Sequence, residues 1–303
     1  MDIKLEPLRF LPDSAEMPWG TLEYRLADLG FIDSLAAEGT LGGNTISELM
    51  QTYLERISGD NAFDACGTQF PVMVKLLDVK GRTSLHVNPD DETAEQRYDA
   101  FGKTALWYVL EAGRDSRLYL GFRRDVEPEE FYEKCNDGSV ESLLKEVKPV
   151  PGQAYLIPPG TVHAAKGVKL LEIAESSELW FRLYDWNGGE REIHMEEAFD
   201  LIDFHAAGSL EVQFPVNTPQ MNVRHYEVIA PTGMESPNGE TFRMYVCLGG
   251  SLSVNDITIG PGGVILVPAD LLSWKLEPGK DGADVLEVSY AKYEEKEQWE
   301  KSE

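Results

Sequence analysis

Two histidines and an asparagine stand where strand-like segments end, which is a typical place for a binding site. His86 and Asn88 are two residues apart at the end of one such segment, so both side chains are expected on one face. The later stretch Ile157-Pro-Pro-Gly-Thr-Val-His163 brings a second histidine to a second strand end. Imidazole is the commonest metal ligand in proteins. The three residues therefore predict a polar or metal-binding site.

Both stretches resemble motifs of a known family. The spacing Pro158-x-Gly160-x-x-His163 is similar to the second motif of the cupin superfamily. A longer series runs Lys-Leu-Leu-Asp-Val-Lys, Pro-Asp-Asp, Phe-Gly-Lys-Thr, Leu-Trp-Tyr-Val and Arg-x-Tyr-Asp, in that order. Over residues 17–205 this series resembles the type I mannose-6-phosphate isomerases, which are zinc-dependent cupins. The resemblance implies a metal-assisted interconversion of mannose 6-phosphate and fructose 6-phosphate.

The ligand positions depart from the family pattern. Where the family reads Gln-Val-His-Pro-Asp-Asp, this chain has its histidine two residues earlier, at His86, and Asn88 at the ligand position. A family glutamate ligand is replaced by Ala105, so only His163 remains in place. Glu172, on a strand similar to the family's Glu-x-Gln-Gln-x-Ser, is the best replacement. His86, His163 and Glu172 would then hold zinc or another divalent metal; a vestigial site without a tightly bound metal is the alternative.

The resemblance also implies which side chains act on the substrate. Arg182 and Lys103 match family residues of the active site, and each would stabilise negative charge on the sugar or its enediolate. Asn88 and Trp19 are expected to bind substrate. For Arg182, an ion pair with Asp185 is the structural alternative.

Composition limits the class of partner. The chain has 303 residues and a net charge of −26, so we expect neither nucleic acid nor an anionic membrane surface as a partner. The expected partner is a small phosphorylated sugar, which would need a local basic pocket, and the oligomeric state stays open. Three cysteines without a C-x-x-C pair suggest neither a disulfide framework nor a thiolate zinc site. The sequence has no apolar signal core, which favours a cytoplasmic protein.

Hydrophobic patterning predicts the elements that position these residues. Thr45-Ile-Ser-Glu48 is a capping-box pattern before an amphipathic helix of about three turns. Strands at residues 72–79 and 83–87 flank a Lys80-Gly81 turn, and strands at residues 106–110 and 117–120 pair around Gly113. Residue types typical of helix N-termini at residues 128–132 and 139–144 predict a helical insertion over about residues 122–147.

A repeated hairpin suggests two related domains. Residues 150–158 and 259–268 each have a glycine turn, an apolar strand and a terminal proline. We therefore predict a mainly β chain of two cupin-like β-barrel (jelly-roll) domains. The first would span residues 1–206 and carry the active site, and the second would span residues 207–303 without a metal motif.

Two other functions stay open beside the isomerase. Loss of the ligands at Asn88 and Ala105 favours a catalytically retired cupin that binds a sugar or sugar phosphate. A cupin of altered chemistry, such as an epimerase or an oxygenase, is the third possibility, because a fold does not fix a function.

Overall fold

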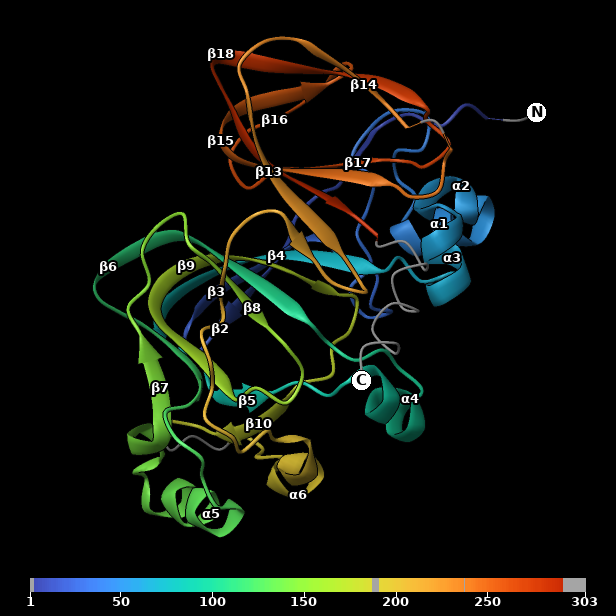
Figure 1. Ribbon diagram of the computed structural model, residues 1–303. Helices are drawn as coiled ribbons and strands as arrows, with labels where there is room; N and C mark the ends of the chain where they lie inside the picture. Colours follow the sequence, from blue (N-terminus) through green and yellow to red (C-terminus); the bar gives the residue numbers. More distant parts are fainter. Residues whose placement is uncertain (1–2, 187–190, 237, 291–303) are drawn as a thin grey trace, which may run out of the picture. The chain divides into compact units, whose positions relative to one another are not determined.

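A computed structural model describes residues 3–186, 191–236 and 238–290 and shows a mainly β protein (Figure 1). The strands form two antiparallel sheets of ten and eight strands. The predicted fold class is thereby confirmed, with helices inserted between strands. The chain also divides into two compact units that alternate along the sequence. The predicted domain boundary at residues 206 and 207 stays a prediction. The Glu/Lys-rich composition from Tyr293 onward predicts a solvated helix end or a disordered tail, and these residues lie outside the described ones.

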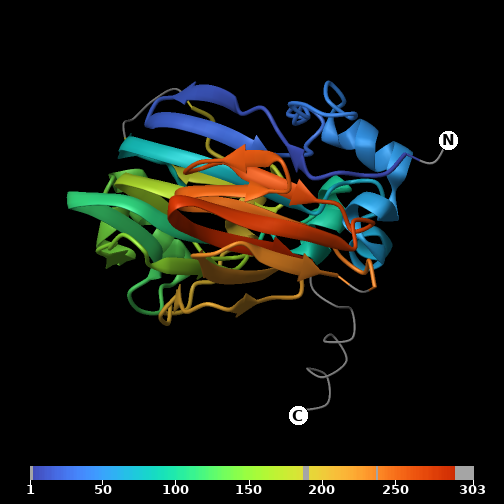
Figure 2. The ribbon, with the colours of Figure 1, turned by 90° about the horizontal axis from the view of Figure 1, so that it is seen from above.

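One unit comprises residues 1–13, 24–74 and 213–303 and contains the eight-stranded sheet. Its strand order is β1-β17-β15-β18-β13-β12, with β14 on β18 and β16 on β15. Helices α1, α2 and α3 lie side by side in both views (Figures 1 and 2). The strands are β1 Leu8–Arg9, β12 Val216–Asn217, β13 Asn222–Val228, β14 Thr232–Glu235, β15 Arg243–Val254, β16 Ile257–Ile259, β17 Val264–Val267 and β18 Ser273–Ser289, and the helices are α1 Ile46–Tyr53, α2 Glu55–Ser58 and α3 Asp60–Cys66.

The other unit comprises residues 14–23 and 75–212 and holds most of the ten-stranded sheet. Its strand order is β11-β8-β6-β9-β4-β3-β2, with β5 on β9 and β10, and β7 on β6. The strands are β2 Asp13–Met17, β3 Gly20–Leu26, β4 Val72–Arg82, β5 Leu85–Val87, β6 Ala105–Phe122, β7 Leu144–Val147, β8 Ala154–Ile157, β9 His163–Glu175, β10 Phe181–Tyr184 and β11 Glu211–Val212. The helices are α4 Asp91–Tyr98, α5 Pro128–Asp137 and α6 Met195–Ala198, and two 3₁₀ turns are η1 Val140–Leu143 and η2 Phe199–Leu201.

The capping box at the start of α1 is present, but the helix is shorter than predicted. The Thr45 amide donates to Glu48 Oε2 at 2.9 Å, and the Glu48 amide donates to Thr45 Oγ1 at 3.3 Å. These bonds satisfy two of the free amides at a helix start. The helix ends at Tyr53 because Leu54 has a positive φ of 52°, after which α2 begins in a new direction.

Two predicted chain reversals are wrong. Lys80 and Gly81 lie within β4, which continues to Arg82, and both amides donate to the Trp19 carbonyl, at 2.8 and 2.9 Å. Likewise, Gly113 interrupts no strand, because β6 runs unbroken from Ala105 to Phe122 beside β9. Extra residues between positions 112 and 117 are absorbed as an irregularity in the β6–β9 register. Glycine marks a bulge here rather than a turn.

The helical insertion is found where it was predicted, but α4 was missed. Proline at the first position of α5 and the 3₁₀ turn η1 account for the insertion, and Phe131 of α5 packs on Phe122 of β6 with ring centroids 5.5 Å apart. Helix α4 follows Asn88 directly. Its N-cap is Asp90, whose Oδ1 accepts from the Thr93 amide at 2.7 Å.

The two repeated hairpins make equivalent backbone hydrogen bonds. Val109 of β6 accepts from the Gly152 amide and donates to the Gln153 carbonyl, both at 2.9 Å. Cys247 of β15 accepts from the Gly262 amide at 2.7 Å and donates to the Gly263 carbonyl at 3.0 Å. The strand orders β8-β6-β9-β4 and β17-β15-β18-β13 correspond in the same way. This correspondence supports an internal repeat within the chain.

Candidate functional site

The two predicted histidines meet across neighbouring strands. His86 of β5 is the register partner of His163, the first residue of β9, and the ring centroids are 4.0 Å apart. His86 Nδ1 lies 3.0 Å from the Ser84 carbonyl and His163 Nδ1 lies 2.7 Å from the Thr161 carbonyl. A carbonyl accepts only, so each Nδ1 carries the proton, and each Nε2 keeps its lone pair. In the described part of the chain no residue hydrogen-bonds to either Nε2.

Burial keeps both imidazoles neutral. Loss of solvent lowers the pKa of His163 to about 4 and lowers that of His86 well below its ordinary value, with the neighbouring His163 as the second cause for His86. His163 is 1% exposed. Neutral imidazoles with free Nε2 atoms can bind a metal ion or accept a proton.

Asn88 is held next to this pair by its backbone. The Gly160 amide donates to the Asn88 carbonyl at 3.0 Å, which joins the two strand-end motifs. Gly160 has φ +81°, and a Cβ there would lie 3.0 Å from the Leu201 carbonyl oxygen, so the position requires glycine. The Asn88 side chain is 2% exposed, and its Oδ1 has no hydrogen-bond partner within the described ranges. A buried amide oxygen without a partner costs stability unless a ligand satisfies it.

A buried ion pair lies under the site. Lys75 of β4 contacts Glu172 of β9, with Nζ and Oε1 2.8 Å apart and both side chains 8% exposed. The Trp107 indole Nε1 donates to Glu172 Oε2 at 2.7 Å, and the Trp107 ring packs edge-on against His163 at 5.4 Å. Burial raises the pKa of Glu172, but the ammonium groups of Lys75 and Lys103 outweigh it and hold that pKa below its usual range.

Lys103 adds a second buried ammonium. Its side chain is 4% exposed, and its amide donates to the Pro89 carbonyl at 3.0 Å. Burial and the like charge of Lys75 lower the pKa of Lys103 to about 8, against the opposing effect of Glu172 and Glu178. Near neutral pH this lysine is therefore mostly charged but releases its proton readily.

Arg182 of β10 lies opposite His86 of the neighbouring strand β5. The two residues are register partners, and Arg182 Nε lies 3.2 Å from Ser84 Oγ while its guanidinium carbon is 4.7 Å from the Trp180 ring centroid. The predicted alternative for Arg182, an ion pair with Asp185, is not formed. Asp185 pairs instead with Arg191, whose Nε donates to Asp185 Oδ2 at 2.7 Å. Arg182 makes no salt bridge with any described carboxylate, so its charge remains available.

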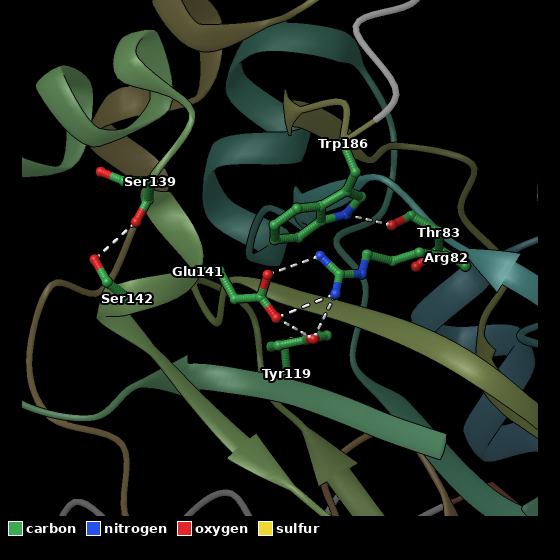
Figure 3. A network of polar contacts seen from close by, with 7 residues as sticks. All are labelled: Arg82, Thr83, Tyr119, Ser139, Glu141, Ser142 and Trp186. Atoms are coloured by element: carbon green, nitrogen blue, oxygen red, sulfur yellow. Dashed lines mark hydrogen bonds and ion pairs between the residues drawn. The ribbon is translucent and has the colours of Figure 1, made fainter. Parts of the chain in front are cut away.

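A polar network fixes the segment that leads into β5 (Figure 3). The Arg82 guanidinium stacks 4.2 Å from the Trp186 ring centroid and binds both oxygens of Glu141 at 3.1 Å. The Tyr119 hydroxyl donates to Glu141 Oε1 at 2.6 Å, and the Trp186 indole donates to the Thr83 carbonyl at 2.8 Å. These contacts anchor Thr83, three residues before His86.

A basic cavity of about 620 Å³ lies beside this network. Its basic lining residues are Lys80, Arg82, Arg114 and Lys166. Arg82 is already neutralised by Glu141, and Lys80 Nζ lies 2.7 Å from an Asp78 oxygen. The cavity therefore offers fewer free charges to an anion than its composition suggests.

The structure brings most of the predicted site residues together, whereas the described backbone contacts of Trp19 are made with β4. His86, His163, Arg182 and Glu172 share contacts within one unit, and the β6 register puts Ala105 on the same face as Trp107. The described hydrogen bonds of Trp19 reach only Lys80 and Gly81. Among residues 3–186, 191–236 and 238–290, no three His, Cys, Asp or Glu side chains are placed to share a metal ion.

Lys75 is the site residue that sequence reasoning missed. It stands in the apolar run Val72-Met-Val-Lys-Leu-Leu77, where a buried charge requires a partner. A lysine inside an apolar strand was therefore the sequence signal that could have revealed Lys75 as part of the site. Its partner on β9 is 97 residues away in sequence and follows only from the β4–β9 neighbourhood.

The chain is similar in sequence to several mannose-6-phosphate isomerases. No protein-family model matches the chain. The chain is 30% identical over 226 residues to the mannose-6-phosphate isomerase ManA of Bacillus subtilis, covering 65% of this chain and 68% of ManA. It is also 33% identical over 176 residues to the probable mannose-6-phosphate isomerase GmuF of the same organism, which covers 56% of this chain and 54% of GmuF.

Solved structures show the same fold. The crystal structure of the Bacillus subtilis mannose 6-phosphate isomerase matches with a TM-score of 0.79 at 26% identity, over 95% of this chain and all of that one. A zinc-bound mannose 6-phosphate isomerase matches with a TM-score of 0.74 over 94% of this chain and 99% of that one, but at 13% identity it shows the fold alone.

The chain belongs to the mannose-6-phosphate isomerase family. Its alignments to GmuF and to the putative mannose-6-phosphate isomerase YvyI, also of Bacillus subtilis, span only about half of those relatives. None of the helices that the structure describes has the length and apolar character needed to cross a bilayer.

Proposed function

We propose that the protein is an aldose–ketose isomerase that interconverts mannose 6-phosphate and fructose 6-phosphate. The observation that carries this proposal is the meeting of His86 and His163, with free Nε2 atoms, beside the charged groups of Lys103 and Arg182. The reaction moves a proton between C2 and C1 through an enediolate, so it needs a proton acceptor and positive charge near the two oxygens. Family membership supplies the substrate class.

Lys103 and Arg182 are proposed to stabilise the negative charge of the enediolate. Both act as cations, and their burial strengthens the interaction with a bound anion. Arg182 is oriented by Ser84 and by stacking on Trp180. Glu172 holds Lys75 in place, and Lys75 in turn lowers the pKa of Lys103.

The residues present fit a divalent metal with open coordination positions. His86 and His163 would bind it through Nε2, in which case neither would be the proton acceptor, and the partnerless Oδ1 of Asn88 would be the third donor. Glu172, predicted as the third ligand, faces Lys75 and Trp107 with its two oxygens, so Asn88 is now the better candidate. When bound, zinc or a similar ion would polarise substrate oxygens as a Lewis acid. Without a carboxylate ligand, this donor set should bind the ion more weakly than two imidazoles with a glutamate.

A retired binding protein is the second candidate function. The observation that favours it is Ala105, 1% exposed on the same sheet face as Trp107, because a methyl group there can neither bind an ion nor move a proton. Lys103 and Arg182 would still hold a sugar phosphate.

A coupled assay for fructose 6-phosphate, together with calorimetry, separates the two functions. The protein is assayed with mannose 6-phosphate after chelation and after addition of zinc, manganese, cobalt or iron. Turnover above that of an Arg182→Ala variant supports the isomerase. Binding of mannose 6-phosphate without turnover under any condition supports the retired binder, and neither activity nor binding contradicts both.

A further inference from the structure

The segment that carries Lys103 is fixed against the start of α4. The Gly102 amide donates to Asp91 Oδ1 at 3.0 Å, and the Lys103 amide donates to the Pro89 carbonyl at 3.0 Å. Gly102 has no room for a side chain, because a Cβ would lie 2.4 Å from the backbone of Asp90. One side of the segment is therefore bound to α4.

The other side of the segment is bound to the end of β9. Glu175 Oε2 accepts from the Thr104 amide at 2.6 Å, and the Glu175 amide donates to the Thr104 carbonyl at 3.2 Å. Ser177 Oγ donates to the Phe101 carbonyl at 2.7 Å. Glu175 is only 6% exposed, although it forms no ion pair with a described lysine or arginine.

Two carboxyl groups meet at this point. The Glu175 side chain also hydrogen-bonds with that of Asp91, and a hydrogen bond between two carboxyl groups requires a proton on one of them. Burial, and then the negative charge of Asp91, raise the pKa of Glu175 to about 7. The Thr104 amide and hydroxyl act on the pKa of Glu175 in the opposite sense. Below about pH 7 Glu175 therefore carries the proton.

We propose that protonated Glu175 is a positioning residue, which bridges Asp91 and Thr104 and thereby holds Lys103 in the site. Its effect on turnover rests on the proposed isomerase function, whereas its effect on the segment does not. When Glu175 loses the proton, two carboxylates lie within hydrogen-bonding distance and repel one another. The bridge then weakens, and Lys103 loses its fixed position as pH rises through the titration of Glu175.

Amide hydrogen exchange tests the bridge without any assay of activity. Protection factors of residues 102–104 are compared at pH 6 and pH 8.5 in the natural protein, Glu175→Gln and Glu175→Ala. We expect a fall of about tenfold in the natural protein, which is a 1.4 kcal/mol change in opening free energy. We expect no pH dependence in Glu175→Gln, because the amide keeps a donor, and low protection at both pH values in Glu175→Ala. Equal protection in all three proteins would overturn the proposal.

Asp91→Asn is the second variant and Glu111→Gln the control. An asparagine at position 91 can donate to ionised Glu175, so Asp91→Asn should also abolish the pH dependence even if Glu175→Gln folds poorly. Glu111 pairs with Lys169 on the exposed side of the same strands, so Glu111→Gln should behave as the natural protein does. A pH dependence that survives in Asp91→Asn contradicts the carboxyl pair.

Turnover gives the catalytic arm of the same test. The natural enzyme should lose kcat with a midpoint near pH 7, whereas Glu175→Gln should keep its kcat to about pH 8, with KM little changed. If all proteins are inactive while exchange follows the expected pattern, the isomerase function fails and the bridge stands. If the active natural enzyme and Glu175→Gln share one pH profile, the positioning role is refuted.

Discussion

Replacing Lys75 by methionine should strongly destabilise the protein, because it leaves the Glu172 carboxylate buried without its cation. The pair is 2.8 Å apart and 8% exposed on both sides. Removing one partner of a buried ion pair costs about 3–5 kcal/mol. For a protein of 303 residues each kcal/mol lowers Tm by about 1.5–2 °C, so Lys75→Met should lower Tm by roughly 5–10 °C.

The double variant Lys75→Met with Glu172→Gln should recover most of this loss. The neutral glutamine keeps an acceptor for the Trp107 indole, and replacing both charges of a buried pair by groups of similar volume is often nearly neutral. We expect the double variant to lie within about 1 kcal/mol of the natural protein. Urea unfolding followed by tryptophan fluorescence gives the four free energies of the cycle.

A matched exposed pair on neighbouring strands provides the control. Lys169 and Glu111 are 3.2 Å apart, with side chains 37% and 74% exposed. Exposed pairs contribute about 0–1 kcal/mol, so Lys169→Met should change stability little. If Lys75→Met costs no more than Lys169→Met, or if the double variant is less stable than either single one, the assignment of Lys75 as the counter-charge of Glu172 is refuted.

Three further predictions concern the site. Under the proposed isomerase function, turnover of Glu175→Gln should fall as pH rises through about 8, because the pKa of Lys103 lies there and only its charged form would stabilise the enediolate. Adding Lys103→Arg should remove this fall, and a pH profile measured on both proteins checks it. Asn88→His with Ala105→Glu should raise zinc affinity at least tenfold in a competition titration with a chelator, because two stronger donors are added; unchanged affinity would place the ion elsewhere. Gly160→Ala should lower stability by about 1–3 kcal/mol in urea unfolding, because φ +81° strains any other residue; a loss no larger than that of Gly208→Ala, where a Cβ meets no atom within 4 Å, would contradict the strain.

Motif spacing was enough to find the residues around the histidine pair, because strand parity and a short glycine motif are local properties. His86 and Asn88 followed from the alternation of side chains along a strand, and His163 from the resemblance of Pro158-x-Gly160-x-x-His163 to the second cupin motif. The meeting of the two histidines needs the β5–β9 register, which no local pattern contains.

The prediction of strands and turns was wrong where glycine was interpreted only as a turn residue. Gly81 and Gly113 both lie in continuous strands, one beside the Trp19 backbone and one at a register irregularity. Both functions of glycine, close approach and bulge, produce the same sequence signal as a hairpin. Partners set by tertiary packing, such as Lys75 with Glu172 and Glu175 with Asp91, could not be predicted either. No local pattern contains the packing that brings these residues together.

The charges around the histidine pair explain how this fold tolerates altered ligands. Lys75 and Lys103 face Glu172 and Glu178, so the buried charges balance without a metal ion. A glutamate in place of Ala105 would add an unpaired negative charge, which only a bound cation or a proton could offset. Fold stability is thereby separated from ion affinity at this site. The isomerase and the retired binder would share one stable structure, and they would differ in how tightly His86, His163 and Asn88 hold an ion.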